Sequence, residues 1–261
     1  MFSILKIIRL GRCLSGIRRG LSQSNPLTPR ILAAIDFDKT IIEQDSYVAV
    51  SQLLPPKQCK ELVNLIPKSG WLGFISRVLQ LLHSEHKVNY ASVGMRVRHL
   101  QAVPGMLRVL RQLARNPEVD LCIVSDANSF FIEEWLKQYA IECLFAGVFT
   151  NPACIQASGE VLVLPYQEQT DCELCPSNLC KGSVLEELIS SGRYKRVVYV
   201  GDSCNDLCAM KRLRAKDIGC IRRGYEMYGK MAAHAGDLSC SVVTWRDGHE
   251  LEMLLMPKIV S

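Results

Sequence analysis

The chain has 261 residues, 48% of them hydrophobic, which is enough for one substantial core or for one core and a small cap. Its formal net charge is +5, but residues 1–30 contain six basic and no acidic residues, so the rest of the chain carries about −1. A nearly neutral body argues against a nucleic-acid-binding surface, and no apolar run reaches the roughly 18 residues that cross a bilayer, so we expect neither nucleic acid nor an integral membrane segment.

Residues 1–30 are predicted to be a basic N-terminal tail or a transit segment. They contain serines, arginines and a lysine but no acids, and they are amphipathic when arranged as a helix. This composition is typical of mitochondrial transit peptides, whereas the simpler alternative is a basic tail on a cytoplasmic protein. We therefore expect a cytoplasmic or mitochondrial protein, with cleavage of the segment and the oligomeric state left open.

From residue 31 the chain alternates short apolar runs with amphipathic stretches. The apolar runs are typical of buried strands, and we predict strands at 31–37, 119–128, 146–151, 161–165 (in a side hairpin), 196–206 and, at the sheet edges, 217–221 and 241–245. Residues 43–103 lack a comparable run and predict a helical insertion, with helices around 46–54, 57–65, 71–83 and 89–101. Further helices are predicted at 104–114, 129–140, 181–190 and 207–214.

Strands that alternate with helices favour right-handed crossovers and an open, mostly parallel sheet, so the predicted fold class is α/β. The carboxyl ends of parallel strands meet at one edge of the sheet, where such folds bind ligands. Three predicted strands end in polar or acidic residues that would meet there: Asp36 with Asp38, Ser125 with Asp126, and Asp202 with Asn205 and Asp206. We therefore expect one site at that edge.

Asp36 and Asp38 form the first candidate catalytic pair. Alternate side chains on a strand point to the same face, so both carboxylates would flank one substrate. One carboxylate could attack phosphorus while the other moves protons, although an Asp-x-Asp sequence also occurs as a simple turn cap.

Asp202 and Asp206 belong to a Gly-Asp-Ser-Cys-Asn-Asp sequence directly after an apolar strand. Hard oxygen ligands of this kind suit Mg²⁺, whereas a helix N-cap by Asp202 or Ser203 would account for only one of the polar groups. Ser125 at a strand end could donate to a phosphate oxygen, and Lys181 at a helix start could neutralise a phosphate or the nucleophile. Alone, each of these two would more often be a cap or a solvated charge.

The order of these motifs resembles the haloacid dehalogenase (HAD) superfamily of phosphatases, over roughly residues 31–250. The resemblance implies that Asp36 is the nucleophile and Asp38 the general acid and base. It also implies that Mg²⁺ is held by Asp36, the main-chain carbonyl of Asp38, and Asp202, while Asp206 ligates directly or orients the site. Ser125 and Lys181 would bind the phosphoryl oxygens.

The same resemblance implies a domain organisation. The fold would be a HAD-like, open, mostly parallel Rossmannoid sheet, with a small helical cap inserted after the first strand. Residues 31–44 and 104–261 would form the core domain. Residues 45–103 would form the cap, which closes over the substrate and excludes water.

Four shorter stretches resemble the phosphoethanolamine/phosphocholine phosphatase (PHOSPHO) family: residues 125–128, 172–181, 222–225 and 241–245. This resemblance implies a small phosphate ester as substrate, of the phosphoethanolamine or phosphocholine type, with pyridoxal phosphate or pyrophosphate as alternatives. A non-catalytic binding protein with a HAD fold is the alternative from another class, and the unbroken set of acidic motifs argues against it.

Tyr47 departs from the family pattern at a position that would bind the substrate. Relatives usually carry an acid there, facing a substrate ammonium, whereas this chain has Asp45-Ser46-Tyr47. Asp126, the other acid associated with that role, is retained. Tyr47 could instead offer an aromatic face to a methylated amine or a ring.

The chain contains 12 cysteines, of which Cys172, Cys175 and Cys180 have a spacing typical of metal ligands. Relatives often have His-x-His before them, but here the stretch is Gln167-Glu168-Gln169. A structural Zn²⁺ site normally takes four ligands, so three local thiolates leave a zinc site and a reduced cysteine cluster as alternatives. A redox role for the Cys-x-x-Cys pair is a further alternative, although it lacks a thioredoxin-like context.

Overall fold

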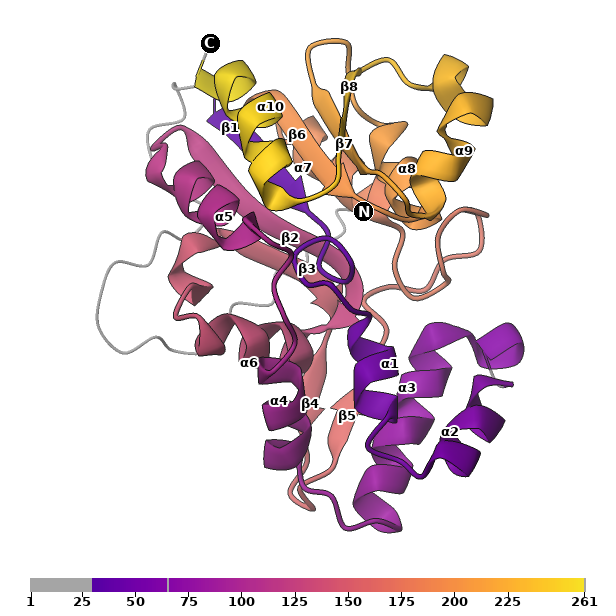
Figure 1. The fold of residues 1–261 in the computed structure, drawn as a ribbon. Helices are drawn as coiled ribbons and strands as arrows, with labels where there is room; N and C mark the ends of the chain where they lie inside the picture. The colour runs from indigo at the N-terminus through magenta and orange to yellow at the C-terminus, as the bar shows by residue number, and fades with distance from the viewer. Residues whose placement is uncertain (1–29, 65, 261) are drawn as a thin grey trace.

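A six-stranded parallel sheet forms the centre of the protein in a computed structural model that describes residues 30–64 and 66–260 (Figure 1). The strand order is β3-β2-β1-β6-β7-β8, and every neighbouring pair is parallel. The strands are β1 (Arg30–Ile35), β2 (Val119–Asn128), β3 (Gly147–Asn151), β6 (Tyr194–Gly201), β7 (Ile218–Arg222) and β8 (Ser241–Trp245). The predicted α/β class with a mostly parallel sheet is confirmed.

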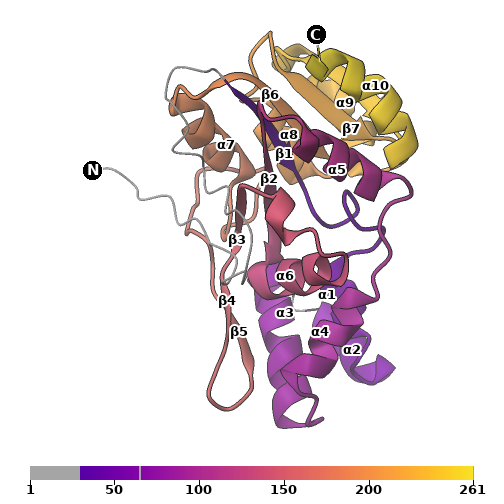
Figure 2. The same cartoon turned by 90° about the vertical axis from the view of Figure 1, so that its left-hand side faces the viewer.

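Both faces of the sheet are covered by helices, which is why its strands are continuous apolar runs (Figure 2). Ile31, Ala33 and Ile35 of β1 join one core cluster, and Leu32 and Ala34 join the other. The first cluster includes residues of α5 (Met106–Arg115), α6 (Ser129–Gln138) and α10 (Gly248–Val260). The second includes residues of α7 (Lys181–Ser190), α8 (Cys204–Met210) and α9 (Glu226–His234).

Four helices between β1 and α5 lie together beyond one end of the sheet (Figure 1). They are α1 (Ser46–Ser51), α2 (Pro56–Val63), α3 (Ile66–Ser84) and α4 (Tyr90–Arg98). Helix α4 packs on α6, and α3 packs on β5 of an antiparallel hairpin formed by β4 (Ala153–Ile155) and β5 (Val161–Val163). The exact boundaries between core and cap stay predictions.

Two sequence expectations differ from the structure. The segment 217–221 was expected at a sheet edge, but β7 lies between β6 and β8, because Ser241–Trp245 adds one more strand outside it. The helix expected at 207–214 begins at Cys204, since Ser203 and Asp206 form a reciprocal capping box at its start. Helices α9 and α10 were not predicted.

The predicted basic segment at residues 1–30 lies outside the described residues apart from Arg30, so the transit-peptide and location predictions stay predictions. Within the described part of the chain, no helix has both the length and the apolar character that a bilayer crossing requires.

The strand register sets the end of β1 beside the last residues of β6 and the middle of β2. Ile35 pairs with Ile123 on one side and with Val200 on the other. Asp36 and Asp202 come just after β1 and β6, whereas Ser125 and Asp126 lie at the same level on β2, which continues to Asn128. Backbone pairing alone thus places these polar residues at one edge.

Candidate active site

Asp36 lies directly after β1, at the centre of the sheet edge. Its amide donates to the carbonyl of Val200 (2.9 Å), and its side chain is 3% exposed. Burial raises the pKa of its carboxyl to about 7, although the Lys181 ammonium opposes this shift. The backbone of this residue is therefore fixed by the sheet, while its carboxylate is held in a nearly dry site.

Lys181, the first residue of α7, bridges two of the buried acids. Its Nζ donates to Oδ1 of Asp36 (2.8 Å) and to Oδ1 of Asp206 (2.7 Å), and the side chain is fully buried. Burial works against its positive charge, but Asp206 and Asp36 keep the Lys181 pKa well above its ordinary value. The ammonium stays charged and neutralises part of the acid cluster.

Asp206 accepts hydrogen bonds on both of its carboxylate oxygens. Its Oδ1 accepts from Lys181 and from the Tyr199 hydroxyl (2.6 Å), and its Oδ2 accepts from the amides of Asp202 and Ser203 and from the Ser203 hydroxyl (3.0, 2.9 and 3.0 Å). Burial opposes ionisation, but Lys181 and these donors hold the Asp206 pKa below its ordinary value. This carboxylate acts as the organiser of the loop that follows β6.

Asp202 follows β6 and completes the cluster. One carboxylate oxygen from each of Asp36, Asp202 and Asp206 lies within 4.8 Å of the other two. Burial, together with the charges of Asp206 and Asp36, raises the Asp202 pKa to about 8. Three buried carboxylates against one buried ammonium leave an excess of negative charge, which is the environment that a divalent cation relieves.

Asp38 is held by the start of α1 (Ser46–Ser51). Its Oδ1 accepts from the Ser46 amide and its Oδ2 from the Ser46 hydroxyl, both at 3.0 Å. Burial and the nearby Asp45 and Asp36 charges raise the Asp38 pKa well above its ordinary value, although the Ser46 bonds oppose this. A carboxyl whose pKa is raised by its surroundings is suited to general acid catalysis.

The end of β2 contributes Ser125 and Asp126. Ser125 is fully buried, and its hydroxyl accepts from the Ala127 amide (3.3 Å). Asp126 is half-buried, and burial raises its pKa while Lys181 opposes the shift. Both residues therefore lie on the strand next to Asp36, as the sequence predicted.

Tyr47 lies against the end of β2 rather than facing open space. Its hydroxyl donates to the Asp126 carbonyl (3.1 Å), and its ring packs edge-on against Phe131 with centroids 5.8 Å apart. The ring is 4% exposed, so little aromatic surface remains for stacking. Burial, with the Asp126 and Asp38 charges, raises its pKa well above the ordinary value, so Tyr47 forms a neutral wall of the site.

Arg222 at the end of β7 fixes the loop that carries Asp38. It donates to the Lys39 carbonyl and to both carboxylate oxygens of Glu43 (3.1 and 3.0 Å), and it lies 4.5 Å from the centroid of the Tyr225 ring. Lys39 has a φ of 57°, a conformation that costs a lysine free energy and needs such support. The arginine therefore positions the loop without reaching the acid cluster itself.

Sequence reasoning missed several of these supports. Ser46, Tyr199 and Thr40 each bond a candidate site acid, with Thr40 donating to Oδ1 of Asp202 at 3.4 Å. A hydroxyl inside an otherwise apolar strand, as in Tyr199, is a signal that could have pointed to a buried polar partner.

Gly201, the last residue of β6, leaves the space that Asp206 occupies. A Cβ at this position would lie 2.4 Å from Cγ of Asp206. We expect Gly201→Ala to lower the free energy of unfolding by about 2 kcal/mol, as overpacking of a buried site does. Urea denaturation checks this, with Gly229→Ala as the control because its Cβ meets nothing within 4 Å. Equal stability of the two variants would show that the Asp206 contact tolerates a methyl group.

The fold is HAD-like, as it is in the solved structures that this chain resembles. Solved phosphoserine phosphatases share the fold. A phospho-aspartyl intermediate analogue of phosphoserine phosphatase aligns with a TM-score of 0.57 over 87% of this chain and 99% of that chain, at 15% identity. A substrate-bound phosphoserine phosphatase complex aligns with a TM-score of 0.58 over 87% and 98%, at 14% identity.

The comparison of sequences is more specific. The family described as Putative Phosphatase matches residues 31–259, and the chain belongs to this family. It is 35% identical to the pyridoxal phosphate phosphatase PHOSPHO2 of Mus musculus, over 85% of this chain and 95% of that protein. It is 28% identical to the phosphoethanolamine/phosphocholine phosphatase of Homo sapiens, over 96% of both, and 29% identical to inorganic pyrophosphatase 2 of Arabidopsis thaliana, over 87% and 82%. The predicted family is confirmed.

Proposed function

We propose that this protein is a Mg²⁺-dependent phosphatase that hydrolyses a small phosphomonoester through an aspartyl-phosphate intermediate on Asp36. The observation that carries the proposal is the fully buried Lys181 ammonium, which holds Oδ1 of Asp36 at 2.8 Å beside the acid cluster. A carboxylate oriented in this way by a rigid helix start is a preorganised nucleophile.

The residues divide the reaction into two transfers. In the first, an Asp36 oxygen attacks phosphorus, the bond from phosphorus to the ester oxygen breaks, and Asp38 gives its proton to that leaving oxygen. In the second, Asp38 takes a proton from water, the water oxygen attacks the aspartyl phosphate, and Asp36 and inorganic phosphate are released. Ser125 and Lys181 bind the phosphoryl oxygens throughout.

The acid cluster fits a divalent cation. Asp36 and Asp202 offer buried carboxylate oxygens, and their raised pKa values reflect negative charge that Lys181 neutralises only in part. Mg²⁺ would be held by these two carboxylates and the Asp38 main-chain carbonyl. When bound, it supplies positive charge that offsets the repulsion between Asp36 and a phosphate dianion. We propose that Asp206 orients the site, because donors from four residues already bond to its two oxygens.

A panel of some dozens of small phosphate esters, assayed with Mg²⁺ and with EDTA, tests the proposed activity. Hydrolysis of at least one ester that disappears with EDTA supports the proposal. A folded protein that turns over none of them would favour the alternative, a HAD-fold binding protein.

Metal exchange gives a sharper expected result. We expect Mg²⁺ to restore activity after EDTA treatment and Ca²⁺ to restore little of it. Ca²⁺ accepts more ligands at longer distances, so it would engage both Asp36 oxygens and misplace the attacking lone pair. Steady-state rates with each ion, after confirming that both ions bind by thermal shift, check this. Equal rates with the two ions would contradict a nucleophilic role for Asp36.

For the substrate, we propose that pyridoxal phosphate competes well with phosphoethanolamine. Tyr47 contributes an uncharged side chain where an acid would face a substrate ammonium, so the attraction for an ammonium would come from Asp126. The 35% identity to a pyridoxal phosphate phosphatase and the 28% identity to a phosphoethanolamine/phosphocholine phosphatase are in line with this preference.

Tyr47→Asp should shift the preference toward phosphoethanolamine. The new carboxylate adds a charge partner for the ammonium, and we expect the ratio of kcat/KM for phosphoethanolamine to that for pyridoxal phosphate to rise roughly tenfold. Tyr47→Phe is the control, since it removes only the hydroxyl bond to Asp126. If wild type already prefers phosphoethanolamine strongly and Tyr47→Asp leaves the ratio unchanged, position 47 does not determine the substrate.

A further inference from the structure

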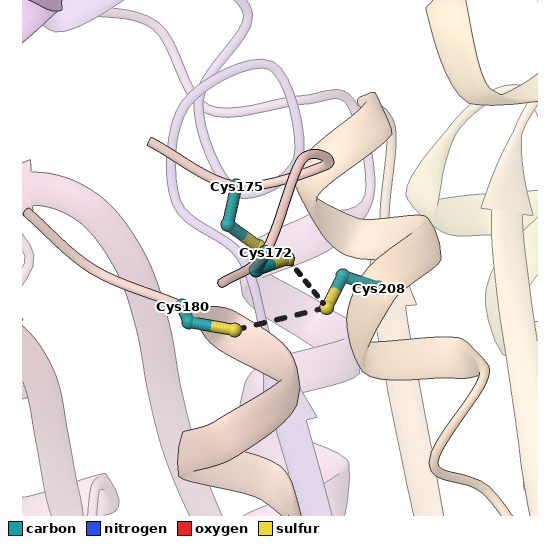
Figure 3. A group of neighbouring side chains, drawn as sticks. All are labelled: Cys172, Cys175, Cys180 and Cys208. Carbon is teal, nitrogen blue, oxygen red and sulfur yellow. Dashed lines mark hydrogen bonds between the residues drawn. The ribbon is translucent and has the colours of Figure 1, made fainter. Parts of the chain in front are cut away.

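Four cysteine sulfurs converge where a loop meets the starts of α7 and α8 (Figure 3). Cys172 and Cys175 lie in the loop before α7, Cys180 caps α7, and Cys208 lies on α8. The sulfurs of Cys172 and Cys208 are 3.4 Å apart, those of Cys180 and Cys208 are 3.8 Å apart, and all four lie within 4.8 Å of one another. The sequence indicated only three of these ligands, because Cys208 is distant along the chain.

These separations fit a shared metal ion better than disulfides. A disulfide places its sulfurs about 2.05 Å apart, and every cysteine in the described residues is free. Four thiolates around Zn²⁺ at bonds of about 2.3 Å would have edges of about 3.8 Å between sulfurs. We propose that Cys172, Cys175, Cys180 and Cys208 bind one structural Zn²⁺ as a closed tetrathiolate site.

The surrounding contacts hold the four sulfurs in place. The Gln169 side-chain amide donates to the carbonyls of Cys172, Cys175 and Pro176 (3.3, 3.1 and 3.0 Å), and its oxygen accepts from the Cys172 amide (2.8 Å). Gln169 lies in the stretch where relatives often have His-x-His, and its hydrogen bonds fix the backbone of the cysteine loop. Cys175, Cys180 and Cys208 are each less than 9% exposed, so the ion would be largely shielded from water.

Gly182 allows α7 and α8 to approach closely enough to complete the set. A Cβ on Gly182 would lie 2.5 Å from the sulfur of Cys208. Without this approach, Cys208 could not reach the three sulfurs of the preceding loop and helix. The fourth ligand is thus supplied by helix packing.

The chemistry of the ligands selects the occupant. Thiolates are soft donors that favour zinc over Mg²⁺ or Ca²⁺, and a set with four protein ligands leaves no open position for substrate. Within the described residues the group contains only cysteines. A structural zinc ion is therefore expected, separate from the carboxylate cluster that would take Mg²⁺.

The site would also brace the proposed catalytic residues. Cys180 directly precedes Lys181, the first residue of α7, and Cys208 lies two residues after Asp206 on α8. Zinc bonds would thus tie together the two helices whose side chains meet at 2.7 Å in the active site. This is a positioning role, since none of the four sulfurs belongs to the acid cluster.

Elemental analysis and cobalt substitution of the full-length protein test the proposal. We expect one zinc per chain after purification, and after replacement by Co²⁺ an intense visible absorption of tetrahedral cobalt with thiolate-to-cobalt charge transfer. Cys172→Ser and Cys208→Ser should each lose zinc and the cobalt spectrum. Cys240→Ser is the matched control, a buried cysteine outside the group that should retain both.

Several results would overturn the zinc site. One is a wild-type protein that contains much less than one zinc per chain when purified from zinc-supplemented cells and that shows no cobalt spectrum. The others are iron in place of zinc and a disulfide among the four cysteines. Retention of zinc by both Cys172→Ser and Cys208→Ser would do the same. The cobalt spectrum of the wild type tests the zinc site even if the variants do not fold. The readout is also independent of turnover, so an inactive protein that binds zinc would count only against the proposed phosphatase.

Discussion

Asp36→Asn is expected to lower kcat by roughly 10⁴-fold or more while leaving the protein folded. The amide has nearly the same shape, so the hydrogen bond from the Asp36 amide nitrogen to Val200 and the strand β1 persist. It lacks the nucleophilic oxygen, so no aspartyl phosphate can form. Steady-state kinetics on the best ester, with circular dichroism to confirm folding, measure this effect.

Asp38→Asn provides the contrast. A phosphoenzyme should still form from an ester with a good leaving group, but its breakdown should slow because no carboxylate activates water. Acid-quench trapping with radiolabelled ester should therefore show phosphoenzyme in Asp38→Asn and none in Asp36→Asn. Wild-type-like turnover by a folded Asp36→Asn protein would refute covalent catalysis at this residue.

Asp36→Asn should also change how the stability of the protein depends on pH. The Asp36 pKa is raised from an ordinary 3.8 to about 7 in the folded protein. The protonated carboxyl therefore stabilises the folded state fully below pH 3.8, and this stabilisation is lost as the pH rises toward 7. In EDTA, the wild type should therefore lose stability across this window more steeply than Asp36→Asn does. Thermal denaturation at pH 5 and pH 8 compares the two proteins.

Lys181→Met should have the second large effect, on both stability and rate. Removing the buried ammonium leaves Asp36 and Asp206 facing each other without their shared partner. Breaking a buried ion pair in this way typically costs about 3–5 kcal/mol, and the loss of a phosphoryl-binding charge should lower kcat by roughly 10²–10³-fold. Urea denaturation near pH 8 measures the first effect and steady-state kinetics the second.

The stability loss in Lys181→Met should shrink at low pH. In the wild type, Lys181 lowers the Asp206 pKa below 3.8, so this stabilisation persists between pH 8 and pH 4.5. Without the ammonium, the carboxylates relieve their repulsion by taking up protons as pH falls. The difference between the two proteins should therefore be larger at pH 8 than at pH 4.5.

Lys195→Met is the control for this experiment. Lys195 pairs with Glu118 at 2.8 Å, but both side chains are more than 40% exposed, and such surface pairs contribute about 0–1 kcal/mol. A loss of stability in Lys181→Met no larger than that in Lys195→Met would show that the buried pair is not what holds the cluster together.

Much of the fold and of the candidate site could be read from local pattern. An apolar run that ends in an acid identifies a buried parallel strand and a residue at its carboxyl end, and Asp36 and Asp202 were located in this way. The prediction for residues 217–221 was wrong about the sheet edge, because strand order depends on which later segment pairs outside it. The residues of a strand do not determine which other strand pairs beside it.

The partners of the site acids show a similar limit. The sequence indicated Lys181 as a cation near phosphate or nucleophile, but only the structure shows that it contacts Asp36 and Asp206 together. Likewise, the sequence left open whether Tyr47 presents an aromatic face, and only the structure shows its ring against Phe131 and its hydroxyl bonded to the Asp126 carbonyl. Side-chain direction depends on how helices pack on the sheet, which is a long-range property.

By itself the sequence determined the α/β class, the HAD motifs and the strand ends at which chemistry would occur, because each depends on residues adjacent in the chain. The tertiary structure alone decided that Lys181 reaches Asp206 and that Cys208 joins Cys172, Cys175 and Cys180. The physical reason is that these contacts join segments far apart in sequence. They form only when α7 and α8 pack on the sheet, at the spacing that Gly182 and Gly201 permit.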